Sequence, residues 1–318
     1  MDKLAPLRRL DRYQRRTPVA AVIFGVLKKA SDDSAGNFAA LITYYGFLSL
    51  FPLLLLAISI LGFIVQNNQS ALTVVQSSAL AKIPPLGDTL AHGHLRGSGL
   101  GVVVGALGAL WGGLSITVVA QHAFNQVAGV PYNRRPDFIK VRLRGVRLLL
   151  TVGVLEVAAT AITGAITGIG AGAALAVGGF AVAFAFNVAL FFIAFRQLTA
   201  ASVPTRALWP GIAFASLGWE LVQSLGGFYV AHVLKNATTT YGTFATVIGL
   251  ITWLYLGARI VLYAAELNSV LYRRYWPRSL LDPPTDADDA VHRSLVTMQD
   301  RGPREEVEVT FRPPPVTH

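Results

Sequence analysis

The sequence predicts an all-α membrane protein: a polytopic bundle of six transmembrane helices, with an N-terminal interfacial helix before it and a disordered C-terminal tail after it. Of the 318 residues, 53% are hydrophobic and only 14% are charged, which is too apolar for a surface that water alone covers. Six segments reach the ~20 residues that cross ~30 Å of hydrocarbon. The basic residues gather between these segments, as is typical of membrane topology.

The first 37 residues are predicted to be a basic cytoplasmic segment that carries an interfacial helix. Thr17-Pro18 favours a helix start, because Thr can cap a helix and Pro is tolerated at its first position. The apolar run from Val19 to Leu27 is too short to cross a membrane, so we expect it in the interface. No short apolar core with a small-residue cleavage site is present there, and we expect the first span to direct targeting.

The transmembrane domain is predicted within residues 38–270. Its six spans are expected at Phe38–Val65, Gly99–Phe124, Arg147–Ile169, Ala174–Phe195, Ala207–Val233 and Thr243–Leu267. Pro52 removes a backbone donor inside the first span and predicts a kink there.

The distribution of Lys and Arg predicts that both termini are cytoplasmic. Basic residues concentrate before the first span, in the second and fourth connections, and after the last span. The connections on the other side carry only Lys82, Arg96 and Lys235. Because basic loops stay in the cytoplasm and the number of spans is even, we expect a multi-pass protein of the plasma (inner) membrane with both ends inside.

Residues 271–318 are predicted to be a disordered cytoplasmic tail. The segment is rich in charge and in proline, with Pro283-Pro284 and three consecutive prolines from Pro313. Such a composition buries too little apolar area to fold by itself.

Four glycines of the second predicted span lie on one helical face, because they follow one another at intervals of four, three and four residues: Gly101, Gly105, Gly108 and Gly112. Small residues at this spacing let two helices approach closely. The face is interpreted as helix packing within one subunit, and a dimer contact or a pore lining remains open, so a homo-oligomer also remains open.

Ionisable residues inside the spans are candidates for a functional site, since each costs roughly 2.5–3.5 kcal/mol on insertion scales. At ~1.5 Å per residue, Glu156 and Arg259 lie at a similar depth, so one interpretation is an ion pair between them. The other is a polar groove or translocation path lined by Glu156, Asn187, Glu220 and Arg259. Glu266 falls at the membrane edge and calls for no functional explanation on this pattern.

The sequence indicates no enzyme chemistry. It has no Cys. Two of its six His, His92 and His94, are two residues apart, the other four are scattered, and none has acidic partners at metal-ligand spacing. It has no glycine pattern of a nucleotide site in the required context and no nucleophile elbow. We therefore expect no catalytic residue, metal or cofactor. A nucleic-acid partner is also not expected despite the net charge of +10, because the basic residues do not share one face.

Three blocks resemble the YihY/BrkB family of membrane proteins. The first is the run from Phe38 to Leu56, and the second extends from Trp111 through Asn125 into the Arg-rich connection. The third is formed by Tyr241-Gly242-Thr243, Trp253-Leu-Tyr255 and Ala265-Glu-Leu-Asn268. The match covers roughly residues 20 to 275. Arg259 departs from the apolar or small residue expected in many members, so the resemblance implies no family-wide pair with Glu156.

The resemblance implies a six-helix inner-membrane protein connected with envelope integrity and virulence, in contact with membrane lipids. The preferred function is movement or organisation of a lipid or amphipathic solute through the polar groove. A non-transporting scaffold is the alternative. The family was once labelled ribonuclease BN, but metal-dependent ribonucleases use His and Asp clusters to activate water, and the pattern here contains none, so a membrane-associated ribonuclease is the least favoured interpretation.

Overall fold

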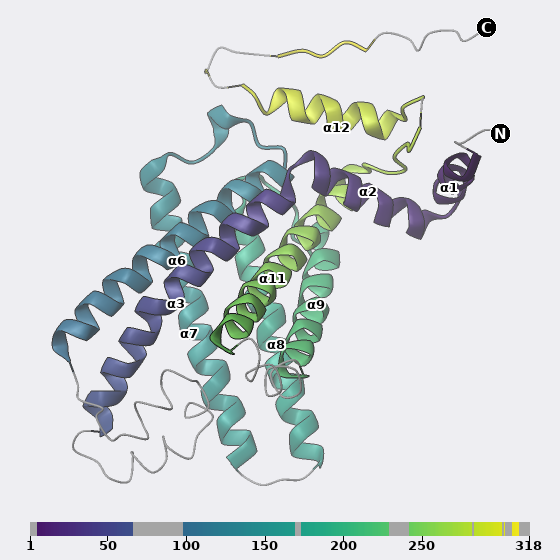
Figure 1. Ribbon diagram of the computed structural model, residues 1–318. Coiled ribbons are helices and arrows are strands. Elements are labelled where there is room, and N and C mark those ends of the chain that lie inside the picture. The colour runs from purple at the N-terminus through teal and green to yellow at the C-terminus, as the bar shows by residue number, and fades with distance from the viewer. Residues whose placement is uncertain are drawn as a thin grey trace, which may run out of the picture. The chain divides into compact units, whose positions relative to one another are not determined.

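The computed structural model describes residues 5–65, 98–168, 173–228, 242–281, 283–300, 302 and 307–311. Within these residues the regular structure is helical throughout, with no strand (Figure 1). Three of the sequence positions used to predict topology, Lys82, Arg96 and Lys235, lie outside the described residues.

A long helix overlaps each predicted span. They are α3 (Ala35–Val65), α6 (Gly99–Val127), α7 (Phe138–Gly168), α8 (Ala173–Leu198), α9 (Trp209–Phe228) and α11 (Gly242–Arg273). Within the described residues, α3, α6, α8 and α11 are the four that are long and apolar enough to cross a membrane. The structure therefore supports several spans, and the crossing of the membrane by α7 and α9 stays a prediction.

The chain divides into two compact units, one formed by residues 43–116 and the other by residues 1–42 and 117–318. In the smaller unit, α3 and α6 pack along the glycine face. A Cβ placed on Gly105 would lie 2.7 Å from the backbone nitrogen of Leu56, and one on Gly108 would lie 2.6 Å from Cβ of Pro52. The glycines thus allow α6 to approach α3 more closely than any larger residue would.

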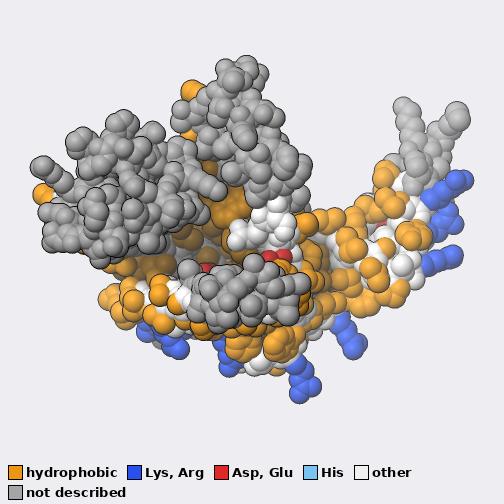
Figure 2. Space-filling view, turned by 90° about the horizontal axis from the view of Figure 1, so that it is seen from below, with side chains coloured by type: hydrophobic (Ala, Val, Ile, Leu, Met, Phe, Trp, Pro, Cys, Tyr) orange, Lys and Arg blue, Asp and Glu red, His pale blue; other side chains and the backbone are white. Residues whose placement is uncertain are grey.

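The larger unit is built around α11, which packs against α9 and α2, while α8 packs against both α7 and α9. Its fully buried side chains include Phe195, Ile212 and Leu262, from α8, α9 and α11. Viewed from below Figure 1, hydrophobic side chains cover much of the described surface, and Lys and Arg side chains lie at its margins (Figure 2). An apolar exterior of this kind is suited to lipid.

Two helices precede the bundle, α1 (Ala5–Arg16) and α2 (Pro18–Asp32). Helix α2 starts directly after Thr17, as the sequence predicted, although the Thr17 side chain forms no cap hydrogen bond. Its inner face is buried. The opposite face exposes Val19, Ile23 and Leu27, which are 69%, 55% and 51% accessible. An exposed apolar stripe is what an interfacial helix requires, and the placement of α2 at the interface stays a prediction.

The prediction of a disordered tail is not confirmed in the described part of residues 271–318. Helix α12 (Asp286–Thr297) begins with a capping box between Thr285 and Asp288. Its Val291 is 1% exposed and belongs to a small core with Val270 and Tyr275. The tail composition is poor in apolar residues, but α11 and α2 provide the apolar and charged partners that the isolated segment lacks.

Candidate functional site

Two of the four predicted groove residues meet in the structure. Asn187 of α8 donates from Nδ2 to Oε1 of Glu220 on α9, over 2.6 Å. Both side chains are half-buried. Each retains further hydrogen-bonding capacity, since a carboxylate accepts several bonds and the amide oxygen accepts others. The pair places a polar contact between α8 and α9.

Arg259 does not pair with Glu156. Its Nη1 donates to the Tyr255 hydroxyl over 3.0 Å and its Nη2 donates to the Tyr263 hydroxyl, while the guanidinium carbon lies 4.7 Å from the centre of the Tyr263 ring. Glu156 is exposed on α7. The two tyrosines lie one helical turn before and one after Arg259. Their hydroxyls accept hydrogen bonds from the guanidinium and their rings lie beside it, so no acid on another helix is needed as a partner.

A buried charge cluster that the sequence interpretation missed joins α2 to α11. The Lys29 ammonium lies 3.1 Å from Oε2 of Glu266 and donates to Val127 O over 3.1 Å. It also forms an ion pair with Asp33. The Lys29, Asp33 and Glu266 side chains are only 4%, 1% and 0% exposed. All three ammonium hydrogens therefore have acceptors inside the protein.

The cluster contains two carboxylates and one ammonium. Burial acts to lower the pKa of Lys29, but the nearby Glu266 and Asp33 together outweigh it and raise the pKa above its ordinary value of 10.5. Lys29 is thus held as a cation. The second carboxylate oxygens, Asp33 Oδ1 and Glu266 Oε1, are buried without a hydrogen-bond partner in the structure. This buried ion pair positions α2 against α11. Its stability depends on all three side chains, because removal of one would leave the others buried with uncompensated charge.

Part of this cluster could have been predicted. Lys29 and Asp33 are four residues apart, a spacing at which opposite charges meet on a helix. Glu266 lies 237 residues from Lys29, and only its membrane-edge position distinguished it in the sequence. No periodic pattern connects two residues so far apart.

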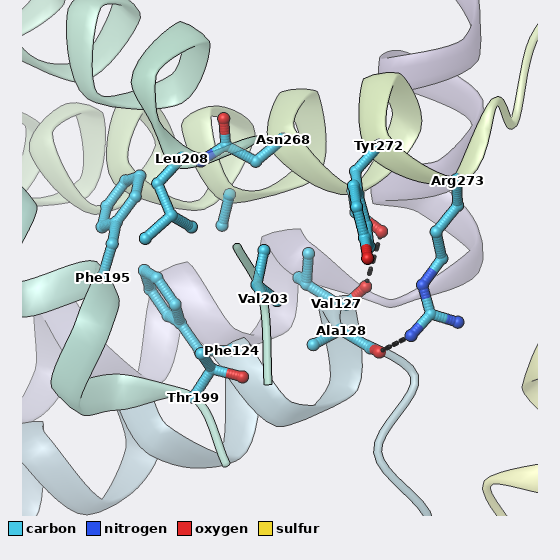
Figure 3. Close-up of a pocket in the computed structure, with 12 residues that line it drawn as sticks. Phe124, Val127, Ala128, Phe195, Thr199, Val203, Leu208, Asn268, Tyr272 and Arg273 are labelled. Atoms are coloured by element: carbon cyan, nitrogen blue, oxygen red, sulfur yellow. Dashed lines mark hydrogen bonds between the residues drawn. The ribbon is translucent and has the colours of Figure 1, made fainter. Parts of the chain in front are cut away.

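A small cavity lies next to the cluster, at the ends of α6, α8 and α11 (Figure 3). Phe124, Phe195 and Leu208 gather at one side of it, and Arg273 lies at the other, where it donates to Ala128 O over 2.5 Å. Its volume is about 50 Å³. Because one water needs roughly 10–15 Å³ by this measure, the cavity has room for a few waters and is too small for a lipid.

Buried amides close the connections around this end of the bundle. Asn125 accepts from the Ala200 N–H over 2.7 Å, and Asn268 accepts from the Gly211 N–H over 2.7 Å. Gln121 donates to Val141 O over 2.9 Å. These contacts give the amides a structural role, because each joins a side chain to the backbone of another segment.

Residues 271–318 contribute a second network, centred on Asp288. This carboxylate pairs with Lys28 at 2.8 Å and with Arg278 at 2.6 Å, and Arg278 also pairs with Asp32 at 2.9 Å. Burial acts to raise the pKa of Asp288, but hydrogen bonds from Lys28, Ser279 and Arg278 outweigh it and hold the pKa well below its ordinary value. The network fastens α12 to α2.

Among the described residues, no three His, Asp or Glu side chains are grouped as metal ligands would be. The expectation that the chain has no catalytic residue, metal or cofactor stays a prediction.

The comparisons with known proteins decide the family. The family model described as Virulence factor BrkB matches residues 26–289. The chain belongs to the BrkB family. This result confirms the YihY/BrkB resemblance and extends it at the C-terminal end into α12. The matched region includes Lys29, Asp33, Glu266 and Asp288.

Several relatives are similar to this BrkB-family chain. Putative ribonuclease-like protein YfkH of Bacillus subtilis is 27% identical over 251 residues, which are 74% of this chain and 90% of YfkH. Inner membrane protein YhjD of Escherichia coli is 24% identical over 274 residues, 79% of this chain and 81% of YhjD. A UPF0761 membrane protein of Pseudomonas paraeruginosa is 36% identical over 101 residues, 31% of this chain and 24% of that protein. No solved structure matches the chain significantly.

The family assignment and the apolar helices agree. This chain of the BrkB family, whose described residues include four helices long and apolar enough to cross a bilayer, is a membrane protein.

Proposed function

We propose that this protein is a multi-pass protein of the inner membrane that moves or organises a lipid or an amphipathic solute and so contributes to envelope integrity. Both termini are cytoplasmic in this proposal. Support for the inner membrane comes from the relative YhjD, whose name states that location. Support for the cytoplasmic termini comes from the concentration of Lys and Arg before the first span and after the last.

The observation that carries the proposal is the contact between Asn187 and Glu220. A carboxylate in a membrane helix costs roughly 2.5–3.5 kcal/mol, and this one is held over 2.6 Å by an amide of the neighbouring helix while remaining half-buried. A polar pair that retains unused hydrogen-bonding groups can bind a headgroup or a polar solute within an apolar surround.

The scaffold alternative has less support. In that alternative the glycine face would mediate assembly and a disordered tail would recruit cytoplasmic partners, so both would have to be free. The glycine face packs against α3 of the same chain, where a Cβ on Gly112 would lie 2.5 Å from Cβ of Ser49. The described part of the tail packs against α2, through the ion pair between Lys28 and Asp288. Both surfaces are therefore used within the chain, whereas the scaffold alternative requires them to be free for other molecules.

We also propose that the chain is not an enzyme, although the name of YfkH calls that relative ribonuclease-like. Purified protein incubated with transfer RNA and a divalent metal is the direct test. The proposal expects no degradation above that of a preparation without the protein, and metal-dependent cleavage that copurifies with the protein would overturn it.

The transport proposal is tested with fluorescent lipids in liposomes that contain the purified protein. We expect movement of lipid between leaflets above that of empty liposomes, and at least a tenfold loss in Glu220→Gln and Asn187→Ala. Glu156→Gln is the matched control, because it removes the same charge from an exposed site on α7. No movement above empty liposomes would overturn transport and favour the scaffold.

A further inference from the structure

A second cavity lies where α2, the start of α3 and α11 meet. Its volume is about 450 Å³, which falls within the range of small-molecule sites, ~300–1,000 Å³. Its walls come from three chain segments, and the residues that line it are Leu27, Ala30, Ser31, Ser34, Ala35, Gly36, Asn37, Arg259 and Tyr263. The cavity is therefore large enough for a headgroup, unlike the 50 Å³ cavity near Arg273.

Among the described residues that line the cavity, Arg259 is the only one whose side chain carries a full charge. Within the described part of the chain, no ion pair joins it to an acid, and its partners are the hydroxyls of Tyr255 and Tyr263. A guanidinium has five N–H donors, so these two bonds leave donors for a ligand. A cation without an acidic partner, in a helix apolar enough to span a membrane, calls for an anion.

The other side of the cavity also suits an anion. The first turn of α3 lines it with Ala35, Gly36 and Asn37. The Asn37 N–H donates to Ser34 O over 2.9 Å, and the N–H groups of Ala35 and Gly36, which have no acceptors within the helix, are left for an anion. Nη1 of Arg259 lies 3.5 Å from the position that a Cβ on Gly36 would take. The guanidinium and the positive end of α3 therefore face the same space.

An apolar surface continues from the cavity. Leu27, which lines it, is the last member of the exposed stripe on α2 that includes Val19 and Ile23. An anionic headgroup in the cavity would leave acyl chains beside this stripe. A phospholipid fits this surface better than a free phosphate, because its headgroup can occupy the cationic cavity while its acyl chains lie on the apolar stripe.

We propose that this cavity binds the headgroup of an anionic phospholipid, with the phosphate on Arg259 and the acyl chains along Val19, Ile23 and Leu27. The inference deepens the proposed function, because it names the class of lipid, and it rests on that function for its purpose. The binding itself is measurable without any transport assay.

The test is a titration of the full chain in a neutral detergent with dihexanoyl phosphatidylglycerol, dihexanoyl phosphatidylcholine or inorganic phosphate, followed by the unfolding temperature. We expect saturable stabilisation by the phosphatidylglycerol at a concentration at least tenfold lower than by either of the other two. Arg259→Gln should raise the apparent Kd at least tenfold. Arg259→Lys should fall between, because Lys keeps the charge and loses the planar fork.

The matched control is Arg144→Gln, which removes the same charge from an exposed site of α7 outside the cavity lining and should change Kd less than twofold. Ser31→Glu provides a second variant should Arg259→Gln fail to fold, since Ser31 is exposed on α2 and a carboxylate there would take the place of the anion. Ser31→Glu should abolish the selective binding of phosphatidylglycerol, whereas Ser31→Gln should retain most of that binding.

Equal binding of the two lipids, or an unchanged Kd in both Arg259→Gln and Ser31→Glu, would overturn the inference. Inorganic phosphate binding as tightly as phosphatidylglycerol would also overturn it, in favour of a small-anion site. Selective binding without lipid movement in liposomes would contradict the transport function and support the binding site. Lipid movement without selective binding would support the transport function and contradict the binding site.

Discussion

Removing the ammonium of Lys29 should destabilise the protein more than any other single charge deletion in α2. In Lys29→Met, Asp33 and Glu266 would share a site in which their side chains are only 1% and 0% exposed, without the ammonium with which both pair. Breaking a buried ion pair by removing one partner costs about 3–5 kcal/mol, because the remaining charge is buried and uncompensated. We expect a loss of about 3 kcal/mol or more in the free energy of unfolding.

The assay is equilibrium unfolding of the purified protein in mixed micelles, followed by far-ultraviolet circular dichroism. Lys28→Met is the matched control: the adjacent lysine pairs with Asp288 at 2.8 Å but its side chain is 32% exposed. This pair is partly buried, but Asp288 keeps Arg278 at 2.6 Å when Lys28 is removed, so no carboxylate is left without a cation and Lys28→Met should cost about 1 kcal/mol.

A double-mutant cycle provides the stricter test. Adding Glu266→Gln to Lys29→Met removes one of the stranded charges, and we expect it to recover at least about 1 kcal/mol of the loss. If Lys29→Met costs no more than Lys28→Met, or if the two substitutions simply add, the cluster does not hold α2 to α11 and the reasoning is refuted.

Three further predictions concern pH, packing and the tail. The pKa of Lys29 is raised in the folded state, so the stability that Lys29 contributes is complete below its ordinary pKa of 10.5 and is lost as the pH rises above 10.5. The pKa of Asp288 is lowered in the folded state, so the stability that Asp288 contributes is present above its ordinary pKa of 3.8 and is lost as the pH falls below 3.8. Unfolding temperatures across pH should show the Lys29 loss at the alkaline end in wild type and not in Lys29→Met, and an acid-side loss that is smaller in Asp288→Asn. Gly105→Leu should destabilise by about 1–3 kcal/mol in micelles, because its Cβ would lie 2.7 Å from Leu56 N, whereas Gly153→Leu, with nothing within 4 Å, should not; equal effects would contradict the packing. Thr285→Ala removes the cap of α12 and should cost about 1 kcal/mol and speed proteolysis after residue 285, and an unchanged cleavage rate would show that the cap does not order the tail.

The membrane class, the helical segments and the start of α2 at Pro18 followed from local properties. Apolar length is set by the hydrocarbon thickness, and Thr17-Pro18 acts within one turn. The face containing Gly105 was likewise visible from spacing, since glycines three or four residues apart share a helical face wherever the helix lies. Spacing alone did not indicate which residue of α3 packs against this face.

The partners of charged side chains depended on tertiary structure. Arg259 was paired with Glu156 on depth alone, but the tyrosine hydroxyls of its own helix are closer acceptors. Glu266 was given no role, because its contact with Lys29 joins positions 237 residues apart. The tail was predicted to be disordered from its own composition, and Asp288 finds Lys28 and Arg278 only after α2 and the end of α11 are in place.

The sequence by itself determined that this is a helical membrane protein of the BrkB family, and which residues share each helical face. Only the tertiary structure decided that Lys29, Asp33 and Glu266 form one cluster and that Arg259 lies in a cavity with the start of α3. The physical reason is that hydrophobic length and helical period act over one helix. A buried charge is stabilised by whichever groups packing brings within about 3–4 Å, and these come from distant parts of the chain.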